Sequence, residues 1–123
     1  MTKKILICGA TGFIGRNMLE FFSKNKENQI RALHYKRPKF DVENCGNEIE
    51  WLQGDLRDPS FVNSVMKEID IVIQCAATTS GSKDIVNNPY LHVTDNAVMN
   101  SLLLRSAFDS KIKHFIFFTI FFD

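Results

Sequence analysis

A glycine-rich segment near the start of the chain leaves few folds open: it reads Gly9-Ala10-Thr11-Gly12-Phe13-Ile14-Gly15. A short apolar run, Ile5–Cys8, comes directly before it. Such a run, ending at a glycine, is typical of a strand buried on both faces of a parallel sheet. After the segment, apolar residues recur at three- and four-residue spacing to about Lys24, which predicts a helix. The chain therefore opens with a strand, a glycine turn and a helix.

Each glycine of this turn has a physical use if the turn binds the diphosphate of a dinucleotide. The first allows the tight turn, the second lets the backbone approach the diphosphate, and the third lets helix and sheet pack closely. The helix N-terminus then offers unpaired N–H groups to the phosphates. A glycine-rich turn with no ligand is the alternative. The predicted cofactor contacts in this turn are Gly9, Thr11, Gly12, Phe13, Ile14 and Gly15.

The remaining chain alternates between strand and helix patterns. The predicted strands are Lys3–Cys8, Gln29–Tyr35, Ile49–Gln53, Ile69–Cys75 and Lys113–Phe122. Predicted helices follow the glycine segment, begin at Pro59 with Asp58 as N-cap, and run from about Pro89 to Ala107. This alternation predicts an α/β, Rossmann-like, doubly wound parallel sheet, and right-handed crossovers give the strand order 3-2-1-4-5.

The end of the chain is unusual for this architecture. It stops at Asp123, within or just after an apolar strand whose outer edge nothing covers. Exposed apolar edge strands promote aggregation, and complete domains usually protect them. We therefore expect residues 1–123 to form one domain that is truncated after the fifth strand.

Composition excludes several classes of protein. Fifteen Lys and Arg residues against fourteen Asp and Glu residues give a net charge of +1, which offers no basis for binding nucleic acid or a membrane surface. No apolar run approaches the ~20 residues of a membrane helix, and no secretory signal is present. The three cysteines are odd in number and lack metal-ligand spacing. We therefore expect a cytoplasmic protein without disulfides or a metal site.

The glycine segment resembles, almost letter for letter, the cofactor loop of the extended short-chain dehydrogenase/reductase family. These are NAD(P)-dependent epimerases, dehydratases and reductases that act on sugar nucleotides. Further segments are similar to that family in the same order: Gly54–Asp58, Cys75–Ala77, Asn96, Leu103–Ala107 and Lys113–Phe118. The resemblance covers nearly the whole chain. A narrower likeness, carried by Asn87, Asn88, Tyr90 and Asn96, points towards GDP-fucose-synthase-like reductases.

The resemblance implies roles for residues outside the glycine turn. Asp55 and Leu56 would contact adenine, although Asp55 is also a common turn residue. Cys75, Ala76 and Ala77 would run along the ribose and phosphates. Asn96, at the position of the asparagine in the family's long helix, would also belong to the cofactor site. Homodimers built on helices equivalent to Asn96–Ala107 are common in the family.

The tip of the second predicted strand bears on the choice of coenzyme. A carboxylate there holds the ribose 2′-OH of NAD, whereas an arginine accommodates the 2′-phosphate of NADP. This chain has His34 at the tip, with Lys36 and Arg37 shortly after it. We therefore expect NADP, with NAD as the alternative, and assign all three residues to the cofactor site. A solvated basic loop is the competing interpretation.

Other polar residues carry weaker predictions. Thr78, Thr79, Ser80 and Ser82 follow the fourth strand, at the edge where open α/β sheets bind ligands, and could line the nicotinamide or sugar pocket. Cys8 and Cys75 lie in predicted strands, where small core residues are more common than nucleophiles.

The proton-transfer residues of the family are missing from the chain. Family members pair a Ser or Thr after the fifth strand with a Tyr-x-x-x-Lys, because hydride transfer at carbon needs a matched proton transfer at oxygen. Here neither Tyr35 nor Tyr90 is followed by such a lysine, and only Thr119 approaches the hydroxyl position. We assign no catalytic residue and expect that the chain alone cannot catalyse the reaction.

Three interpretations remain open. The chain is the dinucleotide-binding portion of an epimerase, dehydratase or reductase that would take a nucleotide sugar at full length. Alternatively, it is a stand-alone, non-catalytic NADP(H)-binding sensor or scaffold module. A relic of the fold that binds nothing is the third.

Overall fold

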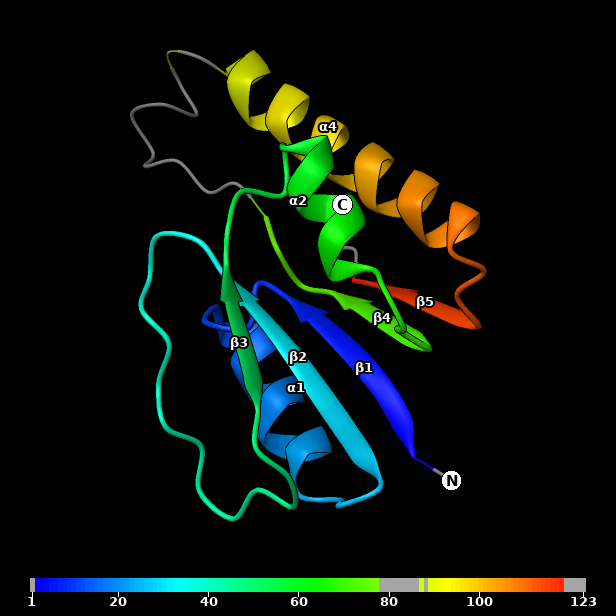
Figure 1. Ribbon diagram of the computed structural model, residues 1–123. Helices are drawn as coiled ribbons and strands as arrows, with labels where there is room; N and C mark the ends of the chain where they lie inside the picture. Colours follow the sequence, from blue (N-terminus) through cyan, green and yellow to red (C-terminus); the bar gives the residue numbers. More distant parts are fainter. Residues whose placement is uncertain (1, 78–86, 88, 119–123) are drawn as a thin grey trace.

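A five-stranded parallel sheet forms the centre of the molecule (Figure 1). The computed structural model describes residues 2–77, 87 and 89–118. The strands are β1 (Lys3–Cys8), β2 (Asn28–His34), β3 (Glu50–Gln53), β4 (Ile71–Gln74) and β5 (His114–Phe117). The helices are α1 (Phe13–Ser23), α2 (Pro59–Val65) and α4 (Pro89–Asp109). The order β3-β2-β1-β4-β5 confirms the predicted topology.

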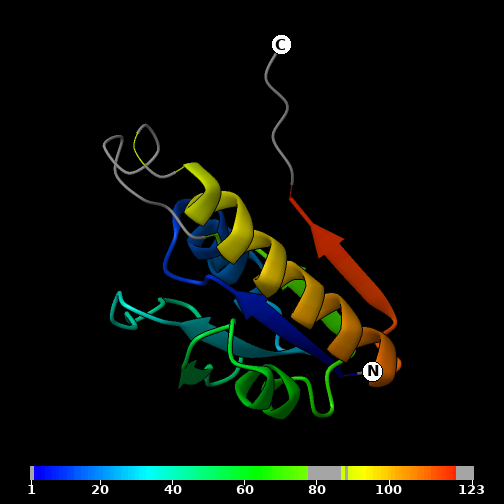
Figure 2. The ribbon, with the colours of Figure 1, turned by 90° about the horizontal axis from the view of Figure 1, so that it is seen from above.

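Two apolar layers hold the helices on opposite faces of this sheet (Figures 1 and 2). Successive side chains of a strand point to opposite faces. In β1, Ile5 and Ile7 therefore pack with Leu19 of α1, whereas Leu6 and Cys8 join the cluster under α2 and α4. Because β1 is central and covered on both faces, its apolar run is continuous.

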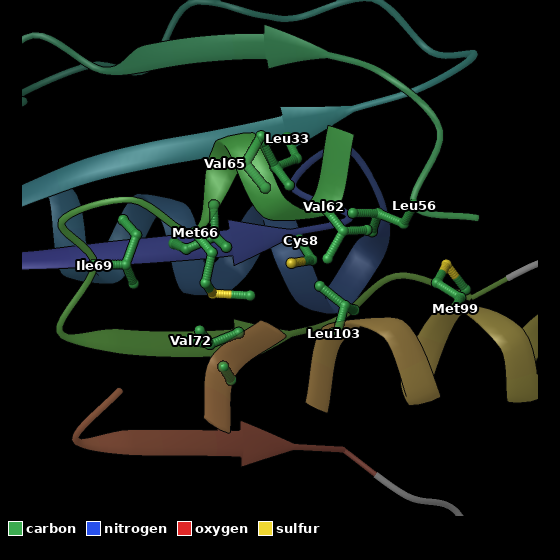
Figure 3. Close-up of a cluster of buried hydrophobic side chains, with 12 residues drawn as sticks. Cys8, Leu33, Leu56, Val62, Val65, Met66, Ile69, Val72, Met99 and Leu103 are labelled. Carbon is green, nitrogen blue, oxygen red and sulfur yellow. The ribbon is translucent and has the colours of Figure 1, made fainter. Parts of the chain in front are cut away.

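The layer between the sheet and the helices α2 and α4 is shown in Figure 3. Val62 of α2, Leu103 of α4 and Cys8 of β1 are each at most 1% exposed. Leu56, from the segment after β3, joins this cluster at 6% exposure. The helix α2 begins as predicted, with Asp58 accepting a hydrogen bond from the Ser60 N–H (3.0 Å) and proline in the first turn.

The last strand is shorter in the structure than the sequence predicts. The predicted strand is Lys113–Phe122, whereas β5 spans His114–Phe117, and 119–123 lie outside the described residues. It is an edge strand whose Ile116 and Phe117 are 42% and 50% exposed. Among the described residues, no helix has the length and apolar character needed to span a membrane.

The connection between β2 and β3 is irregular and is attached to the end of α1. The Gly46 N–H donates to the Ser23 carbonyl (2.8 Å), and the Asn47 amide donates to the Lys26 carbonyl (2.5 Å). A side chain at position 46 would place its Cβ 2.6 Å from the Lys26 Cα. The first of these contacts satisfies the carbonyl of Ser23, the last residue of α1, which a helix end leaves without an intrahelical partner.

A buried arginine joins β2 to the end of α2. Arg31 is 7% exposed, and its Nη1 donates to the carbonyls of Val65 (2.6 Å) and Lys67 (2.8 Å). Its Nε forms an ion pair with Glu50 of β3. Sequence patterns suggested only an apolar strand here, because nothing local indicates that a strand arginine will satisfy a distant helix end.

We predict that Arg31→Met lowers the free energy of unfolding by ~1–3 kcal/mol, the cost of leaving buried carbonyls unsatisfied. Urea unfolding followed by fluorescence of the single tryptophan, Trp51, measures the change. The control is Arg105→Met, whose side chain is 80% exposed and, among the described residues, forms its ion pair along α4 with Asp109. Equal effects of the two substitutions would contradict this role of Arg31.

Candidate functional site

The loops that follow β1, β2, β3 and β4 meet at the carboxyl edge of the sheet. Three backbone hydrogen bonds join them: Ala10 N–H to Leu33 O (3.0 Å), Gly54 N–H to His34 O (3.1 Å) and Cys75 N–H to Cys8 O (3.0 Å). In open α/β sheets, ligands bind at this edge, where the strand order reverses. The reversal here lies between β1 and β4, directly beside the glycine turn.

Two of the three glycines in the turn are required by packing. Gly9 has a φ of +70°, and a Cβ there would lie 2.6 Å from the backbone of Ala76. A Cβ on Gly15 would lie 2.0 Å from the Gly9 carbonyl oxygen. The backbone of α1 is therefore in close contact with the turn, and the turn is in close contact with the segment after β4.

Gly12 differs from the other two glycines. Its φ of −78° and ψ of 173° suit any residue, and the nearest heavy atom to a Cβ there is the Gly9 oxygen at 3.5 Å. Neither its backbone conformation nor the packing requires a glycine. A glycine at such a position would allow a ligand to approach the backbone closely.

The N-terminus of α1 carries no competing anion. No side chain caps it, and its first turn contains no acidic residue. Phe13 is 85% exposed and Ile14 36% exposed, whereas Gly15 is buried. The first N–H groups of this helix and the positive end of its dipole thus lie at the surface next to Thr11 and Gly12.

The predicted coenzyme-selecting residues follow β2. The His34 ring Nδ1 lies 2.8 Å from the Arg37 carbonyl oxygen, and the Arg37 guanidinium donates to the Thr11 carbonyl (3.5 Å). Lys36 extends over the Tyr35 ring, with 5.9 Å between its Nζ and the ring centroid. Arg37 therefore contacts the glycine turn, whereas Lys36 contacts the Tyr35 ring.

The segment after β3 divides its residues between core and surface. Leu56, predicted to contact adenine, has its side chain in the core. Asp55 is partly exposed, and its carboxylate pairs with the Arg57 guanidinium at 2.8 Å. The hydrogen bond from Arg57 is the largest cause of the lowered pKa of Asp55, and desolvation opposes it.

The turn after β4 is braced by a side chain that sequence reasoning missed. Gln74 is 2% exposed; its amide nitrogen donates to Asn100 Oδ1 (2.8 Å), and its amide oxygen accepts from the Ala76 N–H (3.0 Å). Ala76 is partly buried and Ala77 exposed. Gln74 stands at the end of a buried strand, where a polar side chain needs hydrogen-bond partners. This position could have indicated that Gln74 supports the turn.

The two cysteines near the turn behave as thiols. Cys8 is fully buried, and burial raises its pKa. Burial also raises the pKa of Cys75 to about 11. Since the thiolate is the nucleophilic form, neither is activated at neutral pH.

The structure does not gather every predicted residue into one cluster. Asn96 lies on α4, one position after Asp95, whose carboxylate pairs with Arg57 at 3.1 Å. The sequence offered no indication of that pair, since the two residues are 38 positions apart. The predicted hydroxyl-bearing residues Thr78, Thr79, Ser80, Ser82 and Thr119 lie outside the described part of the chain.

Comparison with known proteins identifies the family. The profile of the NAD dependent epimerase/dehydratase family matches residues 5–119. A UDP-glucose 4-epimerase of Vibrio cholerae is 27% identical over 123 residues, covering 95% of this chain and 34% of that protein. An uncharacterized membrane protein of Methanocaldococcus jannaschii is 29% identical over 117 residues, covering 93% and 35%. The chain thus spans about a third of the length of these relatives.

Solved structures share the fold. Pen from Bacillus thuringiensis superposes with a TM-score of 0.75 at 28% identity, covering 94% of this chain and 36% of that one. The UDP-glucose 4-epimerase of Bifidobacterium longum, in complex with NAD+ and UDP, gives 0.76 at 21% identity, covering 94% and 36%. Because the family profile matches most of the sequence, this chain belongs to the NAD dependent epimerase/dehydratase family.

Proposed function

We propose that this chain binds a nicotinamide dinucleotide across the glycine turn, and that NADP(H) is preferred. The observation that carries the proposal is Gly12, which neither packing nor backbone conformation requires to be a glycine. A diphosphate at this point meets the uncapped N-terminus of α1, with no acidic side chain in the first turn to repel it.

The preference for NADP(H) is supported by the charges after β2. No acid stands at the strand tip, and Arg37 reaches the glycine turn. A guanidinium can bind a phosphate with two parallel hydrogen bonds, which a hydroxyl-binding site does not need. Lys36 adds a second cation nearby. These residues would hold the 2′-phosphate.

In this proposal, residues 1–123 supply the dinucleotide-binding portion of an enzyme acting on a nucleotide sugar. Relatives named as UDP-glucose 4-epimerases support the substrate class. These residues contain no Tyr-x-x-x-Lys, so they bind the cofactor without turning over substrate by themselves.

We predict that Gly12→Ser keeps the free energy of unfolding within ~0.5 kcal/mol of the wild type, since serine is a good N-cap and meets no clash. It should weaken NADPH binding at least tenfold, about 1.4 kcal/mol, because its side chain occupies the diphosphate position. Titration of NADPH fluorescence measures the affinity.

Gly15→Ala is the comparison for Gly12→Ser, because it changes a glycine of the same turn that packing does require. Its Cβ would clash with the Gly9 carbonyl. We expect it to destabilise the fold by more than ~2 kcal/mol, as overpacking against backbone does. Unchanged NADPH affinity in Gly12→Ser would show that no ligand approaches the turn there.

We predict that Arg37→Gln lowers NADPH affinity roughly tenfold, the value of one charge-assisted hydrogen bond. Affinity for NADH should change less than about twofold, because NADH lacks the 2′-phosphate. Lys39→Gln, two positions further along the same loop, is the control. Tighter binding of NADH than NADPH by the wild type would overturn the preference.

A further inference from the structure

A buried glutamine connects the end of β4 to the helix α4. Gln74 is the last residue of β4 and is 2% exposed. Its Nε2 donates to Asn100 Oδ1 of α4 (2.8 Å) and to the Ala76 carbonyl (3.2 Å), and its Oε1 accepts from the Ala76 N–H (3.0 Å). Both donor positions of the amide nitrogen are therefore used, and the side chain is held in one orientation.

The asparagine at the other end of this connection belongs to a helix that is fixed by the core. Met99 and Leu103, before and after Asn100 along α4, are 5% and 0% exposed and pack in the cluster between the sheet and α4. Closely packed apolar side chains tolerate little displacement. Asn100, which is itself partly buried, therefore offers Gln74 an acceptor whose position is set by the packing of α4.

The backbone of Ala76 in turn limits where the glycine turn can lie. A Cβ on Gly9 would lie 2.6 Å from both the N and the Cα of Ala76. The Gly9 carbonyl accepts from the Gly12 N–H (3.1 Å), so a displacement of Gly9 also displaces Gly12. Contacts therefore run without a break from α4, through Gln74 and Ala76, to the glycine turn.

Stability alone does not call for a glutamine at this position. Gln74 lies beside Cys8 of β1, which belongs to the apolar cluster, and replacing a buried hydrogen-bonded pair by apolar groups of the same shape is often nearly neutral. A buried polar network with all its partners does, however, specify one arrangement of the groups that it joins. What this network specifies is the position of the turn after β4 relative to α4.

We propose that Gln74 and Asn100 are a pair of positioning residues through which α4 sets the position of the glycine turn and thereby its affinity for a dinucleotide. Neither side chain needs to touch the ligand. The inference rests on the proposed dinucleotide site. It adds that binding at the start of the chain depends on a helix that begins at Pro89.

The first experiment needs no ligand and measures amide hydrogen exchange by NMR. The amides of Ala76 and Gly12 are compared with those of the central strand β2, so that a general loss of stability is not mistaken for a local effect. Asn100→Leu removes the acceptor for Gln74 and should speed exchange at both positions roughly fivefold relative to β2, as loss of one buried hydrogen bond allows. Asn100→Asp keeps an acceptor oxygen and should restore most of the protection.

The second experiment measures the affinity for NADPH by titration of its fluorescence. We expect Asn100→Leu to weaken binding roughly fivefold and Asn100→Asp to stay within about twofold of the wild type. Gln74→Met loses all three hydrogen bonds and should weaken binding further. Because the two residues act as one unit, the double variant should bind no more weakly than Gln74→Met alone.

Met99→Ala is the matched control, because it removes apolar contacts of α4 one position from Asn100 and leaves the hydrogen bond in place. It should lower the free energy of unfolding, while local exchange and NADPH affinity stay within about twofold of the wild type. If Asn100→Leu behaves in the same way, the pair has only a structural role and the proposal is wrong.

The outcomes distinguish this proposal from the proposed function. If the wild type does not bind NADPH, the proposed function fails, and with it the effect on affinity; the exchange experiment still decides whether the pair fixes the turn. If the wild type binds NADPH and Asn100→Leu changes neither exchange nor affinity, only the positioning role is overturned. Faster exchange with unchanged affinity overturns its link to binding. Faster exchange and weaker binding, both restored in Asn100→Asp, establish it.

Discussion

The close contact of backbone with backbone at the glycine turn is the constraint on which the rest of this structure depends. Gly15 lies against the Gly9 carbonyl, and Gly9 lies against Ala76, at separations that leave no room for a Cβ. These two contacts bring α1, β1 and the segment after β4 to one point. A side chain at either glycine would push the helix off the sheet or separate the central strands.

Charge is distributed unevenly along the carboxyl edge. Arg37 and the uncapped start of α1 lie at the glycine turn, where no acidic residue occupies the first helical turn. The acidic groups Asp55, after β3, and Asp95, on α4, are each paired with Arg57.

The sequence was sufficient for the topology because the two signals that determine it are local. Short apolar runs mark the buried strands, and the glycine spacing marks the first strand-to-helix turn. Long-range side-chain pairing was not accessible. The guanidinium of Arg57 meets Asp95 only through the packing of α4, and Arg31 meets the end of α2 only across the sheet. The family resemblance assigned Leu56 to the adenine contact together with Asp55, and the structure adds that its apolar side chain packs in the core.

The two apolar layers differ in how much of the chain each one requires. Every buried member of the layer under α1 lies within the first 73 residues, Ile73 being the last. The opposite layer also needs Met99, Leu103 and Ala107 from α4. During synthesis the N-terminal part leaves the ribosome first. The segment up to Ala76 thus already contains the α1 layer and the backbone contacts of Gly9 and Gly15, whereas α4 closes the second layer and brings Asp95 to Arg57 afterwards.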